Sequence, residues 1–190
     1  MFIQTEATPN PATLKFIPGV PVVPSGTADF PNHGAAAGKS PLAESLFEVE
    51  GVAAVFLGSD FVSVTKSDLA DWPVMKPAIL GAIMEHFTRG LPVLAEADNS
   101  ALDGNAEDGP DYDDPIVQQI QELLDTRVRP AVAGDGGDIV FRGFEEGIVY
   151  LSMQGACAGC PSSTATLKMG IENMLRHYIP EVQEVRPAPY

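Results

Sequence analysis

The chain has 190 residues, of which 45% are hydrophobic, and it carries a formal net charge of −15 at pH 7. This length allows one or two domains with usable hydrophobic cores, and no apolar run approaches the roughly 20 residues of a membrane span. Because so acidic a chain repels phosphate backbones and anionic headgroups, we expect neither nucleic acid nor a membrane as a partner.

The first 91 residues predict a small domain that mixes strands and helices. A strand is expected at residues 13–17, and Ser40-Pro41 is typical of a helix start, which predicts a helix to about Val49. Residues 52–57 and 61–65 flank a Gly-Ser-Asp turn and predict a hairpin.

A longer helix is expected to follow this hairpin. One apolar stripe at helical spacing defines its buried side: Met75, Ala78, Ile79, Ala82, Ile83 and Phe87. His33 and His86 lack the spacing of metal ligands, so we expect both histidines to be solvent-facing or structural.

Residues 92–113 predict an acidic, flexible linker between two folded units. No Lys or Arg occurs between Arg89 and Arg127, while Asp, Glu, Gly and Pro are frequent between them. The acidic residues lack the alternating Asp/Asn positions and the terminal Glu of an EF-hand, so a solvated linker is favoured over a calcium site.

Residues 114–190 predict a second mixed domain, so the expected fold class is α+β, with two small domains. Asp114-Pro115 opens an amphipathic helix that should end near Arg129-Pro130, where Arg127 and Arg129 would complement the helix dipole. The Gly-rich segment 134–138 is expected to be a turn.

A hairpin, a helix and a last strand should complete this domain. The hairpin is expected at residues 138–144 and 147–153, the helix should begin near Pro161 or Ser162, and the strand should span 182–185. The apolar face of the helix would contain Leu167, Ile171, Met174, Leu175 and Tyr178.

The only two cysteines of the chain, Cys157 and Cys160, lie between the predicted hairpin and this helix. Position at a helix start favours thiolate over thiol, and thiolates are the form that binds metals. Gly155 and Gly159 would let the backbone bend closely around a ligand. A four-thiolate site needs two more sulfurs, which a second copy of the chain would have to supply.

Four interpretations of this CxxC motif compete. The cysteines could be ordinary core residues, although a glycine-flanked loop is a poor place for inert packing. They could form a thioredoxin-like redox couple, although no βαβ pattern precedes them. They could share zinc across a dimer, or they could share an iron–sulfur cluster. His177 lies near the far end of the helix and is not expected to be a ligand.

Two stretches of the chain resemble a known family. Residues 155–175, which begin Gly-Ala-Cys-Ala-Gly-Cys-Pro, and the upstream residues 129–138, Arg-Pro-Ala-Val-Ala-Gly-Asp-Gly-Gly-Asp, closely resemble the C-terminal domain of NifU-like (Nfu-type) iron–sulfur proteins. Residues 2–19 resemble the start of the N-terminal domain of the mitochondrial and related bacterial members.

This resemblance implies a cluster scaffold or carrier, which is not an enzyme. Its ligands would be Cys157 and Cys160 from each subunit of a homodimer, holding a labile cluster, usually [4Fe–4S] with [2Fe–2S] possible. Its other partners would be cluster donors and apo-protein clients, which the N-terminal domain would recognise. Because no leader pattern precedes residue 10, we expect a bacterial cytoplasmic protein, or a mitochondrial matrix protein in processed form.

Overall fold

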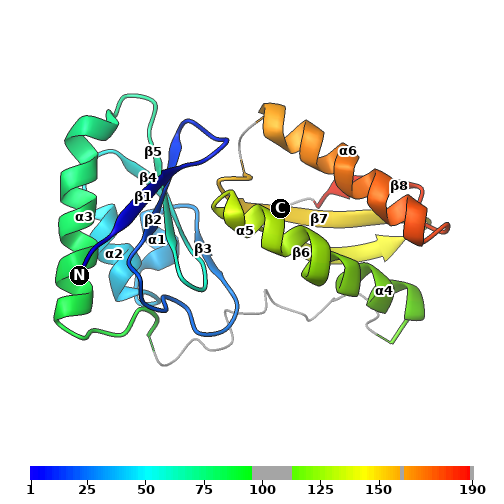
Figure 1. Cartoon of the computed structure of the whole chain (residues 1–190), viewed down its shortest axis with the longest axis horizontal. Coiled ribbons are helices and arrows are strands. Elements are labelled where there is room, and N and C mark those ends of the chain that lie inside the picture. Colours follow the sequence, from blue (N-terminus) through cyan, green and yellow to red (C-terminus); the bar gives the residue numbers. More distant parts are fainter. Residues whose placement is uncertain (96–112, 159–160, 189–190) are drawn as a thin grey trace. The chain divides into compact units, whose positions relative to one another are not determined.

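The computed structural model describes residues 1–95, 113–158 and 161–188, without the side chains of 161–164. The chain divides into two compact units, Met1–Gly104 and Asn105–Tyr190. Each unit combines a β-sheet with helices, which confirms the predicted α+β class (Figure 1). Most of the predicted linker 92–113 lies outside the described residues, and the domain limits 1–91 and 114–190 remain predictions.

The N-terminal unit is built on a five-stranded antiparallel sheet with the order β1-β2-β5-β4-β3. The sequence predicted β2 and the β4–β5 hairpin, but it did not predict the short strands β1 and β3 at the two edges. With four and three residues these strands are too short for a recognisable alternation, and β1 has no buried residue. The strands are β1 Gln4–Ala7, β2 Thr13–Ile17, β3 Ala28–Phe30, β4 Val52–Leu57 and β5 Val62–Lys66.

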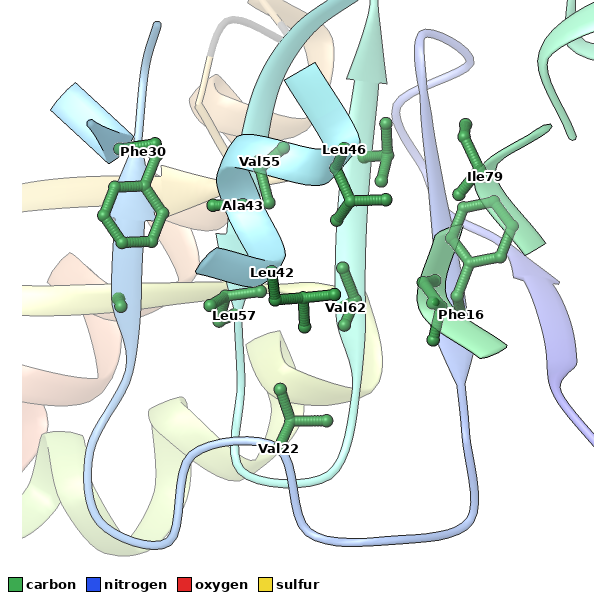
Figure 2. Packing of buried hydrophobic residues seen from close by; sticks show 14 of the residues in the cluster. Phe16, Val22, Phe30, Leu42, Ala43, Leu46, Val55, Leu57, Val62 and Ile79 are labelled. Atoms are coloured by element: carbon green, nitrogen blue, oxygen red, sulfur yellow. The ribbon is translucent and has the colours of Figure 1, made fainter. Parts of the chain in front are cut away.

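Three helices cover one face of this sheet: α1 (His33–Ala36), α2 (Pro41–Phe47) and α3 (Trp72–Thr88). Ser40 starts α2 as predicted, because its Oγ accepts a hydrogen bond from the amide of Ala43 at 3.1 Å. Leu42 and Leu46 of α2 pack on the central strands (Figure 2). Fully buried residues of this core include Phe16, Leu57, Val62, Val64, Ile79 and Ile83.

The buried face of α3 differs from the predicted stripe. Met75, Ile79 and Ile83 are buried as expected, but Ala78 is exposed and His86 is buried, with 3% of its surface accessible. The buried face of the helix is therefore the row Met75, Ile79, Ile83 and His86, and the side chain of His86 lies in the core. Of the two predicted roles for His86, the structural one is confirmed.

His86 should make the N-terminal unit sensitive to acid. Neither ring nitrogen has a hydrogen-bond partner in the described structure. Burial lowers the pKa of His86, and the nearby backbone of Leu91 and Pro92 offsets part of this effect. The folded-state pKa of His86 therefore lies below its unfolded value. Above about pH 6.5 the imidazole is neutral in both states and the free energy of unfolding is unaffected by it. As the pH drops below that value, the unfolded state takes up the proton first, so the free energy of unfolding should fall.

The measurement is denaturant unfolding of the full chain between pH 5.5 and 7.5, followed by fluorescence of Trp72, the single tryptophan, which lies in this unit. The midpoint should fall with pH in the native chain and lose this dependence in His86→Leu. His33→Gln is the matched control, because His33 is exposed. An unchanged pH dependence in His86→Leu would contradict the assignment.

The C-terminal unit has a three-stranded sheet with the order β6-β7-β8. The antiparallel hairpin of β6 (Gly137–Glu145) and β7 (Ile148–Gly155) confirms the prediction. The last strand, β8 (Glu184–Pro187), lies slightly later than the predicted 182–185 and pairs in parallel with β7. The helix α6 (Pro161–Tyr178) connects these parallel strands, so β7, α6 and β8 form a β-α-β crossover that the sequence did not predict.

The first helix of this unit does not end at Arg129-Pro130. It runs through α4 (Pro115–Leu123), a π-helical segment η2 (Leu124–Val128) and α5 (Arg129–Gly134). The amide of Arg129 donates to the carbonyl of Leu124, five residues earlier. Such a widened turn accommodates a proline that a regular helix would exclude.

Because the helix continues, the two arginines are not in its last turn and do not cap its dipole as predicted. The guanidinium of Arg127 lies 5.1 Å from the ring centroid of Tyr178, and Arg129 bonds Asp138. Tyr178 itself is exposed, and the buried position next to it is occupied by Ile179.

One apolar cluster joins both helical segments to the sheet of this unit. It includes Ile120, Leu124, Val128, Val132, Ile139, Leu151, Ile171, Leu175 and Val185. The unit is therefore a two-layer α+β structure with its helices on one face of the sheet. Among the residues described, no helix has the length and apolar character needed to cross a membrane.

Candidate metal centre

The thiol loop, residues 156–160, connects the end of β7 to the start of α6. Gly155 ends β7 with φ +65°, a conformation that favours glycine. The amide of Ala156 then donates to the carbonyl of Gly136 at 3.1 Å, and the amide of Ala158 donates to the carbonyl of Gly155 at 3.1 Å. The start of the loop is thus a tight turn tied to the residue before β6.

Cys157 is buried and belongs to the apolar cluster of the C-terminal unit. Its sulfur lies directly against Gly137: a Cβ atom at that position would stand 2.7 Å from Sγ of Cys157 and 2.6 Å from the carbonyl oxygen of Gln154. Real side chains do not tolerate such contacts, so the first residue of β6 must be glycine for Cys157 to occupy this place.

Gly137 is a site residue that sequence reasoning missed. The sequence predicts that 134–138 is a turn into a strand, and it predicts no contact of Gly137 with the thiols. The signal that could have found it is a glycine at the predicted start of a strand, because glycine in a strand often marks a close approach of another part of the chain.

Cys160 and Gly159 lie outside the described residues. The helix α6 begins at Pro161, directly after Cys160, as predicted. The loop also occupies the carboxyl end of a parallel strand, where β-α-β units commonly bind ligands. Soft thiolate donors at a helix start suit zinc or an iron–sulfur cluster, so the residues present fit such a group.

None of the three histidines belongs to the thiol loop itself. His177 is exposed in the last turn of α6 and its ring meets that of Tyr178, with 5.1 Å between centroids. His33 is exposed in the other unit and contacts Phe47 in the same edge-to-face manner. Within the described ranges, no group of three or more His, Cys, Asp or Glu side chains could hold a metal ion.

An ion pair lies beside the start of β6. The guanidinium of Arg129 bonds both carboxylate oxygens of Asp138, at 2.9 Å from Nε and 2.8 Å from Nη2. The hydrogen bond to Asp138 is the main reason why the pKa of Arg129 is raised above its ordinary value. Asp138 is buried, with 3% of its surface accessible.

Both units match known protein families. The family described as "Scaffold protein Nfu/NifU N terminal" matches residues 3–90, and the family described as "NifU-like domain" matches residues 120–186. The human protein named "NFU1 iron-sulfur cluster scaffold homolog, mitochondrial" is 54% identical over 186 residues, covering 97% of this chain and 71% of its own length. The chain belongs to the Nfu family.

A fly relative agrees with this membership. The Nfu protein of Drosophila simulans, which carries the same name as the human one, is 55% identical over 97% of this chain. The present chain spans 64% of the length of that relative. Among solved structures, a NifU-like protein from Saccharomyces cerevisiae is 25% identical, with a TM-score of 0.45, covering 50% of this chain and 86% of that one.

Proposed function

We propose that this Nfu protein is a scaffold or carrier that holds a labile iron–sulfur cluster between two copies of the chain and delivers it to apo-proteins. The observation that carries the proposal is the pair Cys157 and Cys160 in the loop between β7 and α6, in a chain with no other cysteine. Two thiolates per chain satisfy half of a four-thiolate cluster, so the second half comes from a partner copy. The cluster is cargo, and the protein performs no turnover on a small substrate.

A carrier protein must bind its cluster weakly enough to release it to a client. With two ligands from each subunit, a client thiolate can replace one protein ligand at a time, which favours transfer over permanent storage. We propose [4Fe–4S] as the cargo, cluster donors and apo-protein clients as partners, and the N-terminal unit as the part that recognises them. The human and fly relatives are mitochondrial by name, which supports a mitochondrial location for this chain; these relatives lend no support to a bacterial cytoplasmic one.

Anaerobic reconstitution with iron and sulfide tests the proposal. The product should absorb broadly at the blue edge of the visible spectrum, have the mass of a dimer and contain about four irons per dimer. It should then activate an apo-enzyme that requires a [4Fe–4S] cluster. A colourless monomer that reduces insulin disulfides would instead support a thiol-disulfide oxidoreductase.

A further inference from the structure

The ion pair of Arg129 and Asp138 differs from two exposed ion pairs of the same unit. The pairs Arg176–Glu172 and Arg186–Glu184 use single contacts of 3.9 and 2.9 Å between partly or fully exposed side chains. In contrast, Arg129 approaches Asp138 with two parallel hydrogen bonds, and the carboxylate is buried. Exposed single pairs contribute little to stability, whereas a two-point guanidinium–carboxylate pair also fixes geometry.

The carboxylate of Asp138 accepts hydrogen bonds both from Arg129 and from the backbone of β6. Its Oδ1 accepts from the backbone amide of Ile139 at 2.8 Å as well as from Arg129. The guanidinium of Arg129 also reaches Asp125, one helical turn earlier, at 3.2 Å. The start of β6 is therefore bonded to the helical segment η2–α5 through charged groups.

The two residues immediately before Asp138 contact the thiol loop. Gly137 lies against Sγ of Cys157, and the carbonyl of Gly136 accepts from the amide of Ala156. A displacement of Asp138 would move Gly137 and Gly136 with it, because they are adjacent in the chain. The position of Cys157 thus depends on the same short segment that Arg129 holds.

We propose that Arg129 and Asp138 are positioning residues that hold Cys157 in place for cluster binding. Acting through the Gly136–Gly137 backbone, they keep the Cys157 thiol packed and oriented before a cluster arrives. The role in cluster binding rests on the proposed function, whereas the control of the Cys157 thiol can be tested without any cluster. Lysine cannot replace Arg129 in this role, since an ammonium group does not make two parallel bonds to a carboxylate.

The test uses the full-length apo-protein carrying Cys160→Ser, in which Cys157 is the single thiol. Alkylation of Cys157 by iodoacetamide is followed by mass spectrometry at constant pH, in the parent and with Arg129→Lys, Arg129→Met or Asp138→Asn added. Losing a buried charged hydrogen bond should increase local opening, so we expect alkylation to be on the order of tenfold faster. Arg186→Gln is the matched control and should leave the rate unchanged, because its pair with Glu184 is solvent-exposed.

Urea unfolding of each variant separates positioning from general stability. We expect the alkylation rate to rise by a larger factor than the population of globally unfolded protein, which is calculated from the free energy of unfolding of the same variant. The proposal is overturned if the folded Arg129→Lys and Asp138→Asn variants are alkylated at the parent rate, or if the increase merely matches a loss of global stability. Arg129→Lys and Asp138→Asn are the milder changes and remain informative should Arg129→Met fail to fold.

A second measurement links the pair to the cargo. With both cysteines present, Arg129→Lys should lose its reconstituted cluster to an iron chelator faster than the native protein. An equal release rate would overturn the link to cluster binding. Failure of the native protein to load any cluster would overturn the proposed function instead, while the alkylation result would still decide the role of the pair.

Discussion

Replacing either Cys157 or Cys160 by alanine should abolish stable cluster loading. Each substitution removes one ligand from both subunits, so four thiolates become two, and iron in such clusters is held by thiolates. The measurement is the iron and sulfide content and the visible absorption after anaerobic reconstitution and desalting. We expect less than about a tenth of the native loading, because the proposed site is left with half of its donors.

His177→Ala is the control for this experiment. His177 lies exposed at the far end of α6 and should leave loading at the native level. Retained loading in the Cys160→Ala protein would remove that residue from the ligand set. Equal loss in the His177 variant would instead show that the loop alone does not define the site.

Substituting Gly137 by alanine should damage both the C-terminal unit and its cluster loading. The added Cβ would stand 2.6 Å from the carbonyl oxygen of Gln154 and 2.7 Å from the sulfur of Cys157. Either the backbone of β6 or the thiol loop has to move, and such overpacking costs about 1–3 kcal/mol. Chemical denaturation followed by circular dichroism measures the cost, and reconstitution measures the loading.

Gly143→Ala is the matched control, because Gly143 lies on the same strand and a Cβ there would meet no atom within 4 Å. It should change stability by no more than about 0.5 kcal/mol and leave cluster loading intact. A Gly137→Ala protein with native stability and loading would show that Cys157 is not confined by β6.

The sequence by itself was sufficient for several local features of this protein. The strand 13–17, both hairpins, the helix starts at Ser40-Pro41 and Asp114-Pro115 and the helix after Cys160 were all predicted. These features depend on hydrophobic periodicity, turn residues and capping, all of which operate within a few residues of the chain. The CxxC motif and the family resemblance likewise depend on residues that are close in sequence.

Only the tertiary structure decided which distant residues act at the thiol loop. Gly137 lies against Cys157, twenty residues later in the chain, because β6 and β7 pair with Gly137 opposite Gly155. Arg129 was predicted to complement a helix end, yet the helix continues past Pro130 and the arginine reaches Asp138. Strand register, burial and the parallel pairing of β7 with β8 depend on the packing of the whole unit, which no local pattern encodes.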